Sequence, residues 1–392
     1  MSNSVNRRQW LISTGLAAGA SALLPAALPA LRRPHRLSEY ASYHDALLDM
    51  EQLATAARRA AGPIRLSANE NPFGMSPKAK EGIMSGWFEH SLYGLQSTST
   101  LRQAFAKSAG VDASNVLVTQ GSSETLSIAA LAFGLHDSEV VTPWPTFEGL
   151  PRYAEAIGAT VHKVPLGTEL GHDLEAMSTR ITNAVNLVFV CNPNNPTGIL
   201  EPADRLRGFV SAAQHRALVV VDEAYHDFVD DPSHKSMTDL VLKGENIIIS
   251  RTASKIHGLA GLRVGFAIAR PDLIARMQPF ATGNPNAFGM QAAIASIADT
   301  EYQAFVKLRN REGRALLTST LTAMGKRVIP SQTNFVFFQS GIPVAQFGAS
   351  MREKGFLVGR AFPPFTDWCR VSIGTPEEMK GFAAALPSAL RV

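Results

Sequence analysis

The sequence has 392 residues, of which 45% are hydrophobic and 18% are charged. This is an ordinary soluble globular composition, and the length suits one large domain and a smaller one. The formal net charge is only +4 and no basic run occurs, which argues against a nucleic-acid-binding protein. Cys191 and Cys369 lie far apart and outside any CxxC pattern, so no metal site is predicted. They could form a disulfide, but such cysteines more often stay as small buried apolar residues.

The first 30 residues have the pattern of an export signal. Arg7 and Arg8 precede an apolar stretch rich in Ala and Leu, and small residues follow around Ala30. This order is typical of a signal peptide, and the paired arginines resemble a twin-arginine signal. The alternative is an uncleaved membrane anchor, which Pro25 and Pro29 disfavour in a stretch barely long enough to span a bilayer. We expect a periplasmic or secreted protein that uses the twin-arginine route and contacts the membrane only through this signal.

The remaining chain predicts an α/β fold. Residues 38–61 have a helical, partly amphipathic pattern, and a loop rich in Asn, Pro and Gly follows. From residue 111 onward, short Val-, Ile- and Leu-rich runs alternate with helical segments, which indicates a buried parallel sheet covered by helices. After about residue 285 the pattern changes to that of a smaller α+β region. Its strand-like runs are VIPSQTNFVFFQ, KGFLVGR and DWCRVSIGT.

Polar groups follow the predicted strands. Ligands bind beyond the carboxyl ends of parallel strands, so these groups should meet at one edge of the sheet. Gly121, Ser122 and Ser123 follow the run 115–119 at a helix start, which suits an anion, although Gly-Ser is also a common turn and helix cap. The next polar loop is NPNNPTG, in which two prolines could hold an Asn side chain rigidly; the alternative is a plain turn.

Two further strands end in charged groups. The run 217–221 is followed by Asp222 and Glu223, and a buried carboxylate needs a cationic or hydrogen-bonding partner. The run 246–250 leads to Lys255, which is either a buried amine or an ordinary solvated loop residue. An anion site, a rigid amide, a buried carboxylate and a buried lysine together suit pyridoxal 5'-phosphate (PLP). Its phosphate, phenolic oxygen, ring nitrogen and aldehyde match these four groups.

Seven motifs resemble those of the fold-type I PLP-dependent aminotransferases of class I and II, above all the histidinol-phosphate aminotransferase branch. They are SANENPFG, GSSE, NPNNPTG, DEAY, SKxxGLAGLRxG, PSQTNFVFF and RVSIGTPEEM, and the resemblance covers about residues 62–380. It implies a large domain with a mostly parallel sheet covered by helices, plus a smaller α+β domain. We expect a signal peptide at 1–30, an N-terminal segment packing with the small domain at 31–92, a large PLP-binding domain at 93–285 and a small C-terminal domain at 286–392.

The resemblance also implies the roles of individual residues. Lys255 would bond to the cofactor as a Schiff base and then move the substrate proton. Asp222 would pair with the ring nitrogen, and Tyr225 would contact the phenolic oxygen together with Asn195. Tyr93 would reach the phosphate of a neighbouring subunit, in a homodimer with shared active sites. The implied cofactor-binding set is Gly121, Ser122, Ser123, Phe147, Asn195, Asp222, Tyr225, Ser254, Lys255, Arg263 and Tyr93.

The substrate site is less defined by the sequence. By resemblance, Arg370 grips the substrate α-carboxylate as a bidentate pair, and Asn71 and Arg360 are further substrate-binding candidates. We expect His257 to fill space rather than bind the phosphate. Three aromatic residues precede Arg370 and indicate either an apolar or aromatic amino donor or a core of the small domain. They are Phe362, Phe365 and Trp368.

Transamination is the favoured reaction. An L-amino acid would give its amino group to the enzyme and a 2-oxo acid would take it in a ping-pong mechanism. Two alternatives stay open, a histidinol-phosphate:2-oxoglutarate aminotransferase and a PLP-dependent carbon–sulfur lyase. An exported enzyme would be an unusual place for a biosynthetic step, which disfavours the former. A binding protein without catalysis would have lost Lys255 or Asp222, and both are present.

Overall fold

The structure is a computed structural model that describes residues 36–135 and 137–390. The chain divides into two compact units, Met1–Ala41 and Ser42–Val392. The described part of the first unit contains a short 3-10 helix, η2 (Leu37–Glu39). The predicted export signal at residues 1–30 lies outside the described residues. Within the described ranges, no helix combines the length and the apolar character that crossing a membrane requires.

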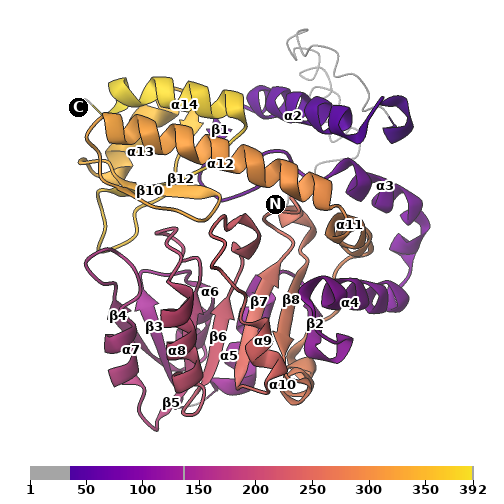
Figure 1. Cartoon of the computed structure of the whole chain (residues 1–392), viewed down its shortest axis with the longest axis vertical. Coiled ribbons are helices and arrows are strands. Elements are labelled where there is room, and N and C mark those ends of the chain that lie inside the picture. The colour runs from indigo at the N-terminus through magenta and orange to yellow at the C-terminus, as the bar shows by residue number, and fades with distance from the viewer. Residues whose placement is uncertain (1–35, 136, 391–392) are drawn as a thin grey trace, which may run out of the picture. The chain divides into compact units, whose positions relative to one another are not determined.

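A seven-stranded sheet forms the centre of the second unit (Figure 1). Its strand order is β2-β8-β7-β6-β5-β3-β4, and all neighbours are parallel except the two pairs that include β8. The strands are β2 (Val116–Thr119), β3 (Glu139–Trp144), β4 (Thr160–Pro165), β5 (Val185–Cys191), β6 (Leu218–Asp222), β7 (Ile247–Thr252) and β8 (Gly265–Ala269). The predicted mostly parallel sheet is therefore confirmed. Because β8 opposes both neighbours, β2 runs in the same direction as β7.

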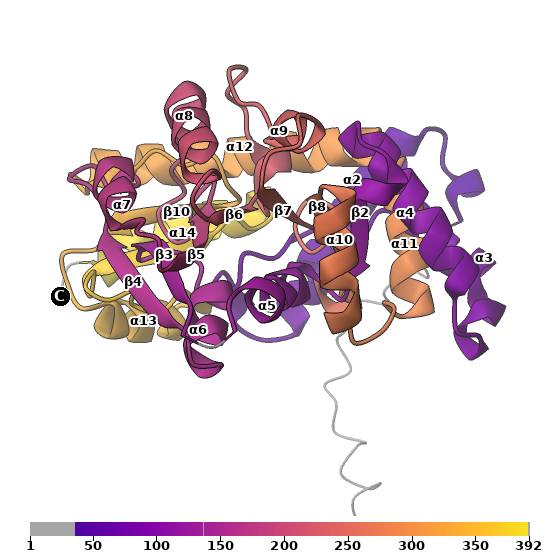
Figure 2. The same cartoon turned by 90° about the horizontal axis from the view of Figure 1, so that it is seen from below.

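The inner strands are largely apolar because both faces of the sheet are covered (Figure 2). In β6, Val219 and Val221 pack on one face, whereas Leu218 and Val220 pack on the other, as the two-residue period of a strand requires. The first face is covered by α4 (Leu95–Ala109), α7 (Leu174–Arg180), α8 (Ala203–Ala213), α9 (Thr238–Leu242) and α11 (Ala287–Ile297). The second face is covered by α5 (Ser122–Phe133), α6 (Gly149–Ala156) and α10 (Pro271–Met277).

A smaller region packs its own core around an antiparallel sheet of order β12-β10-β9. The same region also contains a separate two-stranded parallel sheet, formed by β1 and β11. The strands are β1 (Ile64–Arg65), β9 (Val328–Ile329), β10 (Phe335–Gln339), β11 (Phe356–Leu357) and β12 (Trp368–Ser372). The helices of this region are α12 (Thr300–Ala323), α13 (Val344–Glu353) and α14 (Pro376–Ala389).

The N-terminal segment contacts both regions. Helix α2 (Tyr43–Ala60) begins where Ser42 accepts a hydrogen bond from the Asp45 amide, and its Arg58 forms an ion pair with Glu378 of α14. Helix α3 (Pro77–Ser85) instead packs against α11. The segment 31–92 is thus not confined to the small region, and the predicted boundaries at residues 92 and 285 remain predictions. Both cysteines are free and buried, so the possible disulfide is absent.

Candidate active site

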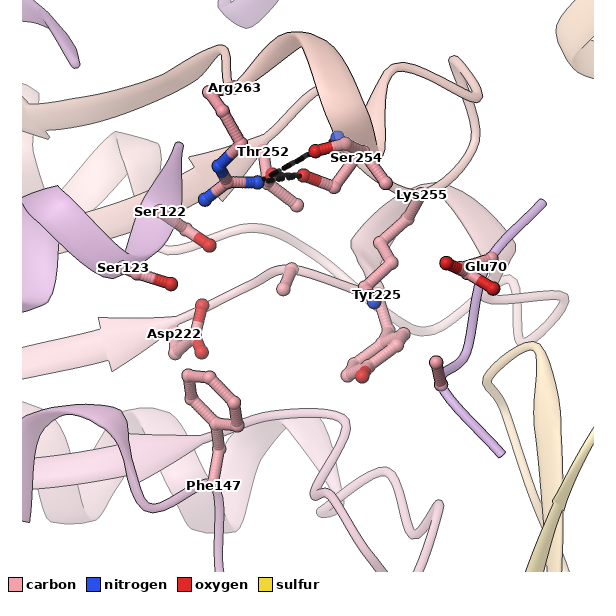
Figure 3. A pocket seen from close by; sticks show the side chains of 13 residues that line it. Glu70, Ser122, Ser123, Phe147, Asp222, Tyr225, Thr252, Ser254, Lys255 and Arg263 are labelled. Atoms are coloured by element: carbon pink, nitrogen blue, oxygen red, sulfur yellow. Dashed lines mark hydrogen bonds between the residues drawn. The ribbon is translucent and has the colours of Figure 1, made fainter. Parts of the chain in front are cut away.

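The carboxyl ends of β2, β6 and β7 meet around one cavity (Figure 3). The cavity is lined by Ala68, Glu70, Ser122, Ser123, Phe147, Asp222, Ala224, Tyr225, Thr252, Ser254, Lys255, Ala260 and Arg263. Segments far apart in the sequence therefore converge on the edge of the sheet that the parallel topology predicts. Most of the residues in the predicted cofactor site lie in this wall. Their individual roles toward a cofactor remain predictions.

One end of the cavity is suited to a phosphate. Helix α5 begins here, and its free N–H groups and dipole favour an anion beside the hydroxyls of Ser122 and Ser123. Arg263 donates to the Ser254 hydroxyl at 3.4 Å and points to the same end (Figure 3). Gly121 has a φ of +89°, and a Cβ there would lie 2.2 Å from the Arg263 guanidinium. Only glycine leaves this approach open without displacing Arg263.

The strand β6 ends in a buried carboxylate, whose Oδ2 accepts a hydrogen bond from the Cys191 thiol at 4.0 Å. Asp222 is 1% exposed, and its Oδ1 accepts no hydrogen bond from the described residues. Burial raises the pKa of Asp222 to about 7, although the Ala224 backbone, the Ser250 hydroxyl and the Lys255 charge act to lower it. The neighbouring Glu223 differs, because burial raises its pKa but an ion pair with Arg251 at 2.8 Å holds the pKa below its usual value. Asp222 therefore remains available for a cationic group.

Lys255 projects into the cavity from the loop after β7 (Figure 3). Its Nζ donates to the Asn69 carbonyl at 2.9 Å and lies 5.4 Å from the centre of the Tyr225 ring. Burial, with the charge of Arg370 as the next contribution, lowers the pKa of Lys255 to about 8. Lowering the pKa increases the fraction of this amine that is neutral, and hence nucleophilic, near neutral pH. The alternative of a solvated loop lysine is therefore not supported.

A hydrogen-bond network connects Tyr225 to Arg370. The Tyr225 hydroxyl accepts from Asn69 Nδ2 at 3.0 Å and from Asn195 Nδ2 at 3.3 Å. Arg370 donates to Asn195 Oδ1 at 2.5 Å and to the Ser67 carbonyl at 2.8 Å. The rigid amide predicted in the NPNNPTG loop thus links the tyrosine to the arginine. Burial raises the pKa of Tyr225 above its usual value, so this hydroxyl stays protonated.

This set of groups fits PLP. The anion site, the buried carboxylate and the lysine amine lie around one cavity, and Phe147 lies beside Asp222 (Figure 3). The α5 N-terminus, Ser254 and Arg263 would hold the phosphate, and Asp222 would hold the ring nitrogen. When bound, PLP supplies an aldehyde that bonds to amines and a ring that accepts electrons from the neighbouring carbon.

Several other predicted residues lie elsewhere. Asn71 does not line the cavity, because its amide is used by the Ile256 carbonyl and the Tyr302 hydroxyl, at 2.9 and 3.0 Å. Its assignment as a substrate-binding residue stays a prediction. Arg360 is exposed and forms an ion pair with Glu148 at 2.7 Å. Tyr93 is 95% exposed.

The aromatic residues before Arg370 belong mainly to a core. Trp368 stacks on Phe337 with ring centres 5.2 Å apart, and Phe362 and Phe365 contact the same ring. None of these four aromatic residues is part of the cavity wall. The interpretation as small-domain core is therefore favoured over an aromatic substrate pocket. His257 contacts the Ser296 hydroxyl at 2.9 Å and does not line the cavity either, which agrees with a packing role.

Three residues that help to build the cavity were not among the site residues predicted from the sequence. Asn69 holds both Lys255 and Tyr225, Glu70 lines the cavity, and Thr252 donates to the Ser254 hydroxyl at 2.9 Å. The SANENPFG motif contained the signal for the first two, but the prediction selected Asn71 from it instead. Asparagines two residues apart in an irregular loop cannot be ranked without the path of the backbone.

Comparisons with known proteins identify the family of this chain. Residues 61–386 match the family described as aminotransferase class I and II. A histidinol-phosphate aminotransferase from Halalkalibacterium halodurans is 33% identical over 330 residues, which cover 83% of this chain and 89% of that protein. A crystal structure of a putative histidinol-phosphate aminotransferase from Erwinia carotovora atroseptica is 35% identical, with a TM-score of 0.81 and coverage of 83% of this chain and 95% of that one.

A second solved structure shows the cofactor. It is the histidinol-phosphate aminotransferase from Sinorhizobium meliloti in complex with pyridoxal 5'-phosphate, which is 25% identical, with a TM-score of 0.77 and coverage of 90% of this chain and 98% of that one. The chain therefore belongs to the class I and II aminotransferase family. It has the fold-type I architecture, and it is a PLP-dependent aminotransferase.

Proposed function

We propose that this aminotransferase moves an amino group from an L-amino acid to a 2-oxo acid, with Arg370 binding the carboxylate of each. The guanidinium of Arg370 is buried, and its Nε has no hydrogen-bond partner among the described residues. No carboxylate among the described residues forms an ion pair with Arg370. Together with burial, the charge of Arg370 lowers the pKa of Lys255. A buried arginine with free donors beside the reactive amine is suited to a substrate carboxylate, and this observation carries the proposal.

Replacing Arg370 with alanine should raise the KM for both the amino donor and the 2-oxo acid. We expect kcat/KM to fall by a factor corresponding to roughly 2–5 kcal/mol, because a buried carboxylate contact is lost. Steady-state kinetics with both substrates measure this. The matched control is Arg352→Ala, which removes an exposed arginine at the end of α13. An unchanged KM for every carboxylic substrate would show that Arg370 has another role.

Histidinol phosphate is a second candidate donor. The Halalkalibacterium halodurans and Sinorhizobium meliloti proteins carry the name of that activity, which supports it. In this chain, however, the exposed Arg360 is neutralised by Glu148. A screen that follows the cofactor spectrum against amino acids and histidinol phosphate separates the two donors. Release of pyruvate and ammonia from sulfur amino acids would instead indicate the carbon–sulfur lyase.

We further propose a homodimer with shared active sites. Tyr93 lies in an exposed apolar stretch, and such stretches mark interaction surfaces. The other exposed members are Met84, Trp87, Phe88, Leu92 and Leu95. A second copy of the chain would cover this surface and bring Tyr93 to the phosphate end of its partner's cavity. The molar mass in solution decides between monomer and dimer.

We propose that residues 1–30 direct export by the twin-arginine route, which places the mature enzyme in the periplasm or outside the cell. This route carries folded proteins, and an enzyme that binds its cofactor inside a finished site suits it. Arg7→Lys with Arg8→Lys should leave active enzyme in the cytoplasm, as activity in cell fractions would show. Continued export of this variant would indicate a general secretory signal. Full-length wild-type protein found only in the cytoplasm would contradict the export proposal.

A further inference from the structure

The loop between β1 and α3 places Asn69 beside the cavity. Asn69 is 2% exposed, and its φ of +54° lies in the left-handed region, which asparagine tolerates better than most residues with a side chain. In this conformation its side chain and its carbonyl reach different partners. The side chain contacts Tyr225 and Ser372, whereas the carbonyl contacts Lys255 and Asn334.

The orientation of the Asn69 amide is fixed by Ser372 on β12. The backbone N–H of Asn69 donates to the Ser372 hydroxyl at 2.8 Å, and that hydroxyl donates to Asn69 Oδ1 at 2.9 Å. With Oδ1 occupied in this way, Nδ2 faces Tyr225 and donates to its hydroxyl at 3.0 Å. The amide therefore acts as a donor to the tyrosine.

This contact determines what the Tyr225 hydroxyl can do. Its oxygen has two lone pairs, and Asn69 and Asn195 each donate to it. Its own proton is thus left for donation, and no group in residues 36–135 or 137–390 forms a hydrogen bond with it as acceptor. Tyr225 lines the cavity, so an acceptor within the cavity is the natural partner of this proton.

The carbonyl of Asn69 acts on the second reactive group. It accepts from Lys255 Nζ at 2.9 Å and from Asn334 Nδ2 at 3.1 Å. The lysine amine is held by this contact at the cavity wall. Asn334 precedes β10, so this carbonyl, like the amide, is fixed by the small region.

We propose that Asn69 is a positioning residue of this active site, which directs the Tyr225 hydroxyl into the cavity and holds the Lys255 amine. The inference rests on the cavity being the PLP site. The charged and titratable groups that act on Tyr225 or Lys255 are Asp222, Cys191, Arg370, Glu70 and Arg263. Asn69 is uncharged, so it acts through hydrogen-bond direction rather than through charge.

The pH titration of the visible absorption of the cofactor-loaded enzyme tests this role. Asn69→Gly keeps the positive φ and the carbonyl but removes the amide. Without this amide, Tyr225 becomes a weaker hydrogen-bond donor and withdraws less charge from the phenolic oxygen of the cofactor. The nitrogen that would join Lys255 to the cofactor then keeps its proton to higher pH. The apparent pKa of the absorption should rise by about 0.5–1 unit. Asn69→Asp should raise it further, because a carboxylate would accept the hydrogen bond that the Tyr225 hydroxyl otherwise donates into the cavity.

The control is Asn115→Asp, which alters a buried asparagine that donates to the Ala269 carbonyl and does not line the cavity. In a Tyr225→Phe background, Asn69→Gly should add no further rise in the apparent pKa of the absorption. A general structural defect would still change this pKa in that background. The inference would be overturned if both Asn69 variants shifted the pKa of the absorption only as much as Asn115→Asp does. It would also be overturned if Asn69→Gly gave its full shift in the Tyr225→Phe background.

Two further readouts keep the test decisive. If Asn69→Gly does not fold, Ser372→Ala serves instead, because it removes the hydroxyl that orients the Asn69 amide. We expect it to raise the pKa of the absorption, and an unchanged pKa would count against the inference. A wild-type enzyme that shows no visible absorption with added PLP would contradict the cofactor assignment, which is a different failure.

Discussion

Replacing Lys255 with alanine should leave a folded protein that turns over substrate at least about 10⁴-fold more slowly. Among residues 36–135 and 137–390, Lys255 supplies the only lysine amine in the cavity wall, and burial lowers its pKa to about 8. No other described lysine lines the cavity and could replace it. The variant should also lack the pH-sensitive visible absorption of the bound cofactor. Absorption spectra and steady-state rates measure both effects.

A matched control for this prediction is Lys243→Ala, which removes an exposed lysine paired with Asp239 at 3.5 Å. It should keep both the absorption and the activity. Borohydride reduction of the wild type should attach the cofactor to the peptide that contains Lys255, as mass spectrometry would show. Attachment to any other lysine, or a Lys255→Ala enzyme with normal spectrum and rate, would refute the assignment.

The sequence predicted the strand-end groups because their positions follow from topology alone. A parallel strand that is buried on both faces is visible as a continuous apolar run, and the first polar residue after it lies at the ligand-binding edge. This placed Asp222 without any knowledge of side-chain contacts, whereas Lys255 follows Ser250, Arg251 and Thr252 and was selected by the family resemblance. The same reasoning held for Ser122 and Ser123, because a helix start after a strand requires only local sequence.

The strand pattern alone could not separate Asp222 from Glu223, and it was the family resemblance that selected Asp222. Both follow the same apolar run, yet Glu223 is paired with Arg251 and receives hydrogen bonds from Ser236 and Met237. Successive side chains at a strand end point to opposite faces of the sheet, so one faces the cavity and the other faces away. Which of them faces the cavity depends on the register of the strand, which no local pattern reveals.

Residues from irregular loops were the least predictable. Asn69 reaches the site because its backbone is left-handed, and its partners Ser372 and Asn334 follow roughly 300 residues later in the chain. The aromatic residues before Arg370 posed the reverse problem, since core and pocket residues have the same composition. Only three-dimensional packing against Phe337 distinguished them. Loops and small-region packing therefore require the structure, whereas the sheet edge does not.

Asp222→Asn should reduce turnover by roughly 10³-fold while the protein still folds and binds PLP. The carboxylate of Asp222 is placed to keep the cofactor ring nitrogen protonated, and a neutral amide of the same size cannot do so. Transient kinetics of proton removal from the substrate measure the loss. Asp112→Asn, a change at an exposed position, is the control and should have normal rates. Equal rates for the two variants would show that Asp222 has no electrostatic role.

The same substitution should stabilise the cofactor-free protein at high pH. Burial raises the pKa of Asp222 from 3.8 to about 7, so the folded state holds its proton where the unfolded state has released it. Below about pH 4, Asp222 is protonated in both states and does not lower the free energy of unfolding. Between about pH 4 and 7, the free energy of unfolding of the wild type falls progressively, and above about pH 7 the full destabilisation remains. A shift of this size corresponds to roughly 4 kcal/mol as an upper bound.

The amide introduced by Asp222→Asn does not titrate, so the free energy of unfolding of the variant should exceed that of the wild type at pH 8, and the difference should shrink toward pH 4. Urea unfolding of both cofactor-free proteins at several pH values measures this difference. A difference that is independent of pH would show that Asp222 has an ordinary pKa in the folded protein. Loss of activity together with a gain in stability would mean that this buried carboxylate is kept for catalysis although it destabilises the fold.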